Sequence, residues 1–260
     1  MARSNKFGTR YAALGFSDKP KLELDDGAMW PTCVRDHQAR RRQNHRAREE
    51  AGWLNSATLS TMEPAFLEFI LSRRSAAALG DPGPSDADLA RILTAAGTVP
   101  DHGQLRPFRF AVVSGEGRTK FGNALADAAA ERKPGLPETA LDAMRAKAMR
   151  SPTSVVVISS PKPGKIEPWE QIAAAACTGY AIVLAAHALG IGAAWKSVPF
   201  TRGKGLTELF GLGPTEETLG WIHLGTSIKP VTTPRAPLDL AAITTVIDGA
   251  EPRPFQPDRT

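Results

Sequence analysis

The order of helical and strand patterns places this chain in the α+β class, as a sandwich of helices around a small central sheet. Three observations predict this fold. Apolar residues recur at helical spacing in the first segments after residue 62. Runs of β-branched residues follow, and helical stretches separate them. With 260 residues and 42% hydrophobic content, the chain can bury one sizeable core.

The helices are expected from apolar spacing and from the residues that start and stop them. The first is short and ends near Arg74, before a stretch rich in glycine and proline. Ser85 and Asp88 form a capping-box signature at the start of the second, which continues to Gly97. Later helices are expected at 117–131, 137–149, 169–190 and 203–211.

Four segments predict strands, at 108–115, 153–160, 191–198 and 218–227. The second of them, TSVVVISS, carries an unbroken Val/Ile run, which is typical of a strand buried on both faces. Between the second and third strands, the helix at 169–190 approaches the length of a membrane span. Because polar residues such as Glu170 and His187 interrupt it, we expect it in a core or an oligomer interface, with Gly190 at its C′ position.

The two ends of the chain differ in composition from the middle. Residues 1–61 hold 11 Lys+Arg against 7 Asp+Glu, whereas 62–260 hold 21 against 20, so the net charge of +5 belongs mostly to the start. We expect 1–61 to be a basic leader, either a solvated tail or not native, and 62–260 to be one domain. The tail beyond Lys229 has six prolines and is expected to be extended and to wrap a partner surface.

Missing motifs exclude several chemistries. No G-x-S-x-G, H-E-x-x-H or Walker pattern occurs, and neither glycine-rich stretch has the context of a dinucleotide fingerprint. Cys33 and Cys177 match no metal or disulfide spacing, so no metal is expected. The N-terminus has no apolar signal segment, which favours the cytoplasm, and no membrane partner is expected.

The remaining candidates bind anions and aromatic rings. Arg73, Arg74 and Ser75 could hold a phosphate through charge-assisted hydrogen bonds, although arginines also favour helix C-termini. His102 and Arg106 stand in the loop before the first long strand. Trp195, Lys196 and Ser197 stand at the end of a later strand.

Taken in order, these motifs resemble the nitroreductase family, specifically its small YdjA-like branch of flavin mononucleotide (FMN) enzymes. The resemblance is carried by RRS, PDHGQLRPFRFAVV, PWEQIAAAACTGYAIVLAAHALGIGAAWKS and a closing LGT, from about Met62 to about Lys229. It implies a nitroreductase-like fold with a small mixed or antiparallel sheet flanked by helices. It also implies a homodimer with two flavins at the subunit interface.

The resemblance further implies roles for the matching residues. Those implied at the FMN phosphate and ribityl chain are Arg73, Arg74 and Ser75, with Lys229 as a further phosphate partner. Those implied beside the flavin are His102, Trp195, Lys196 and Ser197. Those implied to begin the last flavin-side turn are Gly225 and Thr226. Those implied to bind the nicotinamide nucleotide are Ala185, Ala186, His187, Ala188, Leu189 and Gly190.

Three positions depart from the branch, and each changes the cationic groups expected around FMN. Thr98 stands where an arginine precedes the PDH motif, and Arg106 replaces a glutamine and could restore that charge. Lys196 replaces the arginine of a Trp-Arg-Ser triplet, which keeps the charge but loses the planar fork.

The implied activity is electron transfer from NAD(P)H to nitroaromatic or quinone acceptors through FMN, by a ping-pong mechanism. Because the cofactor carries the chemistry, no catalytic acid–base pair or nucleophile is required of the chain. The alternatives are a flavin enzyme of the same fold that performs dehalogenation or flavin cleavage, and a protein that binds nucleic acid through the basic leader.

Overall fold

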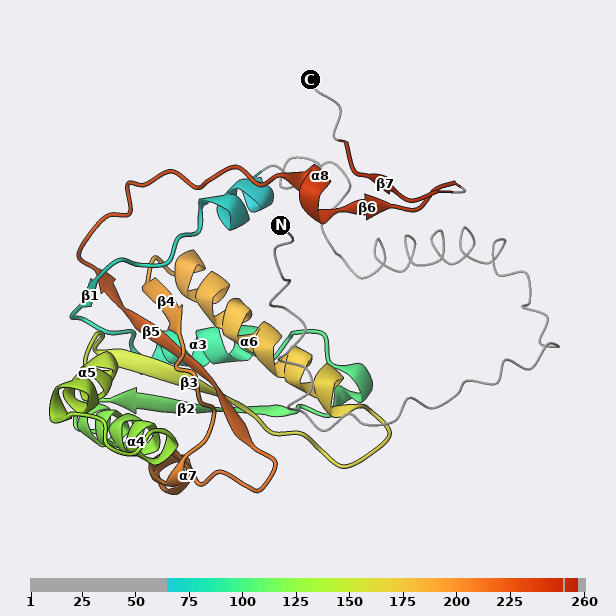
Figure 1. The fold of residues 1–260 in the computed structure, drawn as a ribbon. Coiled ribbons are helices and arrows are strands. Elements are labelled where there is room, and N and C mark those ends of the chain that lie inside the picture. The colour runs from blue at the N-terminus through green and yellow to red at the C-terminus, as the bar shows by residue number, and fades with distance from the viewer. Residues whose placement is uncertain (1–64, 250, 257–260) are drawn as a thin grey trace, which may run out of the picture. The chain divides into compact units, whose positions relative to one another are not determined.

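A computed structural model describes residues 65–249 and 251–256, which belong to the compact unit that begins at Ala65. The predicted basic leader, 1–61, lies outside the described residues. In the described part, helices cover both faces of a five-stranded sheet (Figure 1). The α+β class expected from the order of elements is therefore confirmed.

Every strand pair in the main sheet is antiparallel, which decides between the mixed and antiparallel alternatives. The strands are β1 (Leu79–Gly80), β2 (Phe108–Ser114), β3 (Thr153–Ser159), β4 (Gly192–Lys196) and β5 (Glu217–Ser227). They follow the order β1-β5-β3-β2, and β4 also pairs with β5. At the centre, Val156 of β3 lies opposite Ala111 of β2 and Trp221 of β5.

Strand β3 is buried on both faces, as its Val/Ile run predicts. Val156 and Ile158 belong to the core cluster on one face, and Val155 and Val157 to the cluster on the other. The helices of the first cluster are α4 (Gly117–Arg132), α5 (Glu138–Ala148) and α7 (Lys204–Phe210). Those of the second are α3 (Asp86–Ala96) and α6 (Pro168–Ala188). Each fully buried Val or Ile contributes roughly 1.5–3 kcal/mol to folding.

The helix signals in the sequence are confirmed at most ends. Residues 65–72 are helical, and Ser85 caps α3 through the reciprocal capping box with Asp88. Gly190, with φ of 71°, follows the end of α6 in the left-handed conformation that favours glycine. In the 98–107 loop, His102–Gln104 form one short 3₁₀ turn, labelled η2.

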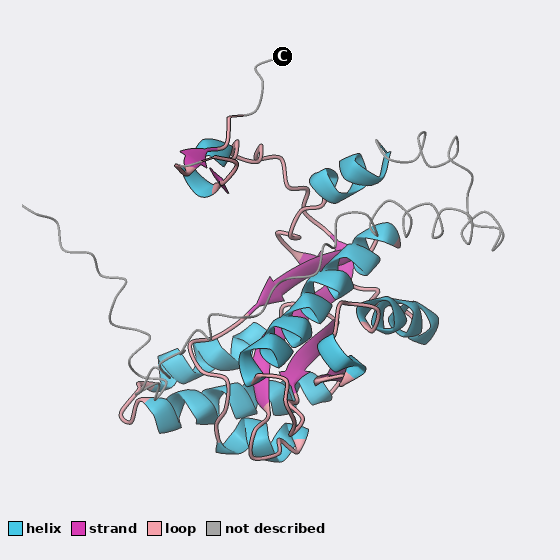
Figure 2. Ribbon diagram, turned by 90° about the vertical axis from the view of Figure 1, so that its right-hand side faces the viewer, coloured by secondary structure: helices cyan, strands magenta, loops and turns pink. Residues whose placement is uncertain are grey.

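Helix α6 lies against the sheet along its length (Figure 2). Its length and composition would suit a membrane span, but 44% of its most apolar window is buried inside the fold. Its inner side contributes Ala175, Ile182 and Ala186 to the protein interior. The core helix of a globular fold can have the same composition. A core is one of the two environments, core or oligomer interface, that the sequence predicts for this helix.

The tail was expected to be extended, and this is correct only as far as Asp239. Beyond it lie a short helix, α8 (Leu240–Ile243), and a small hairpin of β6 (Thr245–Val246) with β7 (Arg253–Pro254). The Asp239 side chain accepts a hydrogen bond from the Ala242 amide, and this contact caps α8. The prolines therefore do not prevent local structure at the end of the tail.

Buried His223 makes the folded state sensitive to acid. It is 2% exposed, and the Trp221 indole Nε1 donates a hydrogen bond to its Nε2 at 2.9 Å. Because an indole N–H only donates, Nε2 must accept, so the ring is neutral with its proton on Nδ1. That nitrogen lies 2.7 Å from the Ser151 hydroxyl and 3.0 Å from the Ser154 hydroxyl. Burial, together with the positive charges of Lys196 and Arg150, lowers the pKa of His223 to about 4.

We predict that the free energy of unfolding falls as pH is lowered from about 6.5 toward 4. In that window the unfolded histidine binds a proton and the folded one does not, so this contribution is present above 6.5 and lost on acidification. The loss is on the order of 3 kcal/mol. Urea unfolding at several pH values measures it. His223→Phe should remove this part of the pH dependence, and an identical pH profile in wild type and variant would contradict the prediction.

Candidate functional site

Two hollows open along β4. One, which we call the basic hollow, has a volume of about 330 Å³ and is lined by Ser72, Arg74, His187, Ala193 and Ser227 among others. The second, the aromatic hollow, has a volume of about 350 Å³ and is lined by Phe121, Trp195, Ser197, Phe200 and Trp221 among others. Ala193 lines the basic hollow and Trp195 the aromatic one, and because a strand rises about 3.3 Å per residue, these two points on β4 lie about 7 Å apart.

The Arg73–Ser75 segment reaches the basic hollow from the end of the first helix. The Ala76 amide donates to the Ala193 carbonyl of β4 at 2.9 Å. One residue before the segment, the Ser72 hydroxyl lies 3.1 Å from His187 Nε2 at the end of α6. Segments far apart in the sequence, RRS, the end of AAHALG and the end of β5, therefore meet here.

A residue that the sequence analysis missed, Arg235, lies against this segment. Its Nη2 donates to the Arg73 carbonyl at 2.6 Å, and Arg74 Nη2 donates to the Thr233 carbonyl at 2.7 Å. Within the described ranges, Arg73, Arg74, Lys229 and Arg235 form no ion pair with a carboxylate. Their positive charge suits an anion. The one sequence signal that could have identified Arg235 as a candidate is its position between two prolines of the tail.

Trp195 stands between the aromatic hollow and α6. Its Nε1 donates to the Leu219 carbonyl at 3.2 Å, and its ring packs over Gly179 of α6. Lys196 and Ser197, which follow it, are exposed. Within the predicted triplet, Trp195 therefore forms part of an aromatic wall, while Lys196 and Ser197 lie at the exposed rim.

His102 lies at the opposite end of α6 from the basic hollow. Its Nδ1 is 2.9 Å from Glu170 Oε2, in the first turn of that helix. The loop holds Gly103, Gln104 and Arg106 at φ values of 75°, 53° and 48°, and the two non-glycine residues in this left-handed region indicate stored strain. The Arg106 amide donates to Asp101 Oδ2 at 2.6 Å, while both the His102 and Arg106 side chains remain exposed.

The length of α6 separates the two groups of predicted residues within one chain. Glu170 contacts His102, and His187 contacts Ser72 beside Arg73. At 1.5 Å per residue, the 17 steps between these helix positions span about 26 Å. A single chain therefore does not bring His102 and Arg74 to one small ligand.

The remaining predicted residues have mixed environments. Of the segment Ala185 to Gly190, His187 and Gly190 line the basic hollow. Ala186 is buried, Ala185 and Leu189 pack against the core, and Ala188 is exposed. Gly225 is buried, where an added Cβ would lie 2.8 Å from the Gly80 carbonyl oxygen. The Thr226 hydroxyl donates to the Pro82 carbonyl at 3.0 Å, and Lys229 is exposed.

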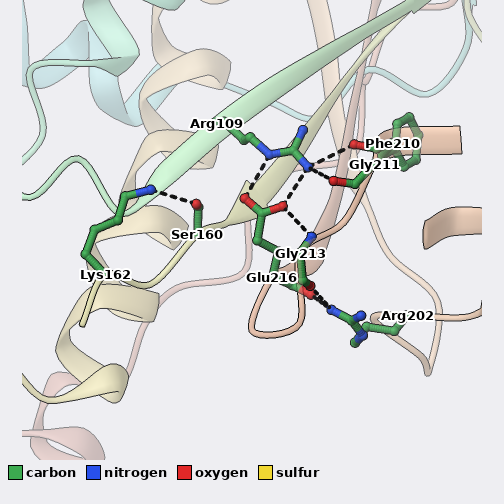
Figure 3. Close-up of polar contacts among 8 residues, drawn as sticks. All are labelled: Arg109, Ser160, Lys162, Arg202, Phe210, Gly211, Gly213 and Glu216. Atoms are coloured by element: carbon green, nitrogen blue, oxygen red, sulfur yellow. Dashed lines mark hydrogen bonds and ion pairs between the residues drawn. The ribbon is translucent and has the colours of Figure 1, made fainter. Parts of the chain in front are cut away.

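A polar network beside the aromatic hollow was also missed by the sequence analysis (Figure 3). Arg109 of β2 donates to both carboxylate oxygens of Glu216, at 2.9 and 2.7 Å. This hydrogen bonding lowers the pKa of Glu216 to about 2 and outweighs the opposing effect of burial. The partners are 107 residues apart, so no local pattern could have paired them.

Comparison with known proteins gives a family match and similar folds. Residues 70–226 match the model of the nitroreductase family. The chain is 34% identical over 161 residues to the protein named "Putative NAD(P)H nitroreductase YdjA" from Escherichia coli K12, covering 62% of this chain and 87% of that protein. Its fold is similar to a crystal structure of a nitroreductase-like family protein from Bacillus cereus, with a TM-score of 0.60 at 24% identity, covering 70% of this chain and 96% of that one. It is also similar to the FMN-dependent nitroreductase NfnB from Mycobacterium smegmatis in complex with NADPH, with a TM-score of 0.56 at 17% identity, over 72% and 99% of the two chains.

We predict that Gly179→Ala destabilises the protein, although helix propensity alone would favour alanine by about 1 kcal/mol. The added Cβ would lie 2.6 Å from the Trp195 ring, so the ring must move, at a cost of about 1–3 kcal/mol. Urea unfolding measures the loss, and Trp195 fluorescence reports the displacement. Gly117→Ala is the control, because its Cβ would meet Val113 at an ordinary 3.7 Å. Equal stabilities for the two variants would contradict the prediction.

Proposed function

Since this chain belongs to the nitroreductase family, we propose that it is an FMN-dependent oxidoreductase that transfers electrons from NAD(P)H to nitroaromatic or quinone acceptors. The observation that carries the proposal is the pair of hollows along β4. One offers the positive charge of Arg74, which pairs with no carboxylate among the described residues, and the other offers aromatic walls.

The residues present fit FMN, which joins an anionic phosphate to a flat aromatic ring. Arg73, Arg74, Ser75 and Arg235 would hold the phosphate through charge-assisted hydrogen bonds. Trp195 and Ser197 would face the ring, with Lys196 supplying a nearby positive charge. When bound, FMN accepts hydride from a nicotinamide and passes electrons to a second substrate. The chain would bind, orient and shield these reactants, which explains why it needs no nucleophile.

The working form would be a homodimer. The outer face of α6 exposes Trp169, Ile172 and Tyr180 at 66%, 41% and 46%, and apolar surface of this kind marks a protein interface. A second copy would also explain how His102, about 26 Å along α6 from the basic hollow, could reach a flavin. In such a dimer, the His102 loop of one subunit would complete the site that Arg74 begins in the other. We place this activity in the cytoplasm.

The purified protein should be yellow, and NADH or NADPH should bleach it under anaerobic conditions. Arg73→Ala and Arg74→Ala should each weaken FMN binding by about 1.5–3 kcal/mol, the range for hydrogen bonds to charged groups. Fluorescence titration of the apoprotein measures the affinity. Arg132→Ala, at an exposed position on α4, is the control and should bind FMN like wild type. A colourless protein that FMN cannot reconstitute would refute the proposal.

A mixing experiment tests the shared site. If Arg74 and His102 of different subunits meet at one flavin, Arg74→Ala and His102→Ala chains should each lose activity when alone. Co-expressed heterodimers should regain about half of the sites, because one of their two sites carries neither substitution. Differently tagged subunits allow the heterodimer to be purified and its bound FMN and reductase activity measured. If both residues served a site within one chain, mixing would restore nothing.

A further inference from the structure

We propose that Arg202 and Glu216 are positioning residues that hold one wall of the aromatic hollow beside the Trp195–Ser197 triplet. The wall is the segment 197–203, which joins β4 to α7. Ser197, Phe200 and Thr201 from this segment line the hollow. The inference rests on the proposed function, because it assigns these residues to the flavin-side wall.

The wall has little regular structure of its own, so its position depends on contacts with other segments. The Arg202 guanidinium donates through Nη1 to the Gly213 carbonyl at 2.8 Å and to the Glu216 carbonyl. One residue earlier, the Thr201 carbonyl accepts hydrogen bonds from the Thr218 amide at 2.9 Å and from its hydroxyl at 2.8 Å. Two adjacent residues of the wall are thus attached to the loop before β5 and to its first residues.

That loop, residues 211–216, is itself fixed by the Glu216 carboxylate. The carboxylate accepts from the Gly213 amide at 3.0 Å and from the fork of Arg109. Arg109 also donates to the carbonyls of Phe210 and Gly211, at 2.9 and 3.2 Å. The connection therefore runs from β2 through Glu216 to Arg202 and the wall (Figure 3).

The position of the network indicates a local role. The side chains of Arg109 and Glu216 are 36% and 14% exposed, and their partners are loop carbonyls and amides near the rim. The core cluster on this face is formed by apolar residues such as Phe121, Leu206 and Trp221, which also line the aromatic hollow, and neither Arg202 nor Glu216 belongs to it. Loss of Arg202 should therefore loosen the wall and leave that core packed. A bidentate, charge-assisted pair is suited to fixing a loop, because it sets direction as well as distance.

The test compares Arg202→Met, which keeps the aliphatic stem, and Glu216→Gln, which removes the charge, with a matched control. Arg145→Met also deletes an arginine, one that pairs with Glu138 and Asp142 on α5. Amide hydrogen exchange is measured on the full chain without FMN. We expect exchange of the Thr218 amide, which donates to the Thr201 carbonyl of the wall, to rise about tenfold or more in Arg202→Met and Glu216→Gln, while α6 and β3 keep wild-type protection. The control should show no change at the Thr218 amide.

A second readout uses the protein loaded with FMN. In the two network variants, the KM for a nitroaromatic or quinone acceptor should rise about tenfold, with FMN affinity changed by less than about twofold. Arg202→Lys should recover part of the effect, because an ammonium can still donate to the two carbonyls. Unchanged exchange of the Thr218 amide, or a rise spread evenly over the whole fold, would overturn the inference. If wild type binds no FMN, the proposed function fails, but the exchange experiment still decides whether Arg202 and Glu216 hold the wall.

Discussion

Burial of β3 and β5 on both faces is the constraint on which the rest of the structure depends. Val155 and Val157 pack under α3 and α6, while Val156 and Ile158 pack under α4 and α7. Apolar residues in these positions fill most of the space over the middle of the sheet. Both hollows open along β4, and Val156 in the middle of β3 also lines the aromatic one.

Helix α6 connects this core to the candidate site and sets its scale. Its inner side completes one of the two cores, its last turn contributes His187 to the basic hollow, and its first turn holds His102 through Glu170. A helix of this length separates its ends by more than a small ligand can bridge. The helix that covers the sheet therefore also keeps His102 and His187 apart within one chain.

Electrostatic interactions have two distinct uses in this molecule. Around the basic hollow, arginines meet neutral carbonyl groups, so their charge remains available for an anion. Beside the aromatic hollow, Arg109 is neutralised by Glu216, and the pair fixes loops. Arginine serves both purposes because its planar fork can donate in two directions while it stays charged.

The sequence by itself determined the α+β class, most helix and strand positions and the family, because these depend on local periodicity, capping residues and ordered motifs. The Ser85 capping box, the Val/Ile run of β3 and Gly190 after α6 are examples in which neighbours in the chain decide the outcome. The predicted site residues were also recognisable as motifs, although their shared role stays a prediction.

Only the tertiary structure decided which of those residues share a hollow. It separated His102 from Arg74, brought Arg235 to the RRS segment, ordered the end of the tail and paired Arg109 with Glu216. These outcomes depend on contacts between segments far apart in the chain. Side-chain charge and local spacing do not predict such contacts, because the contacts form only when the sheet brings distant segments together.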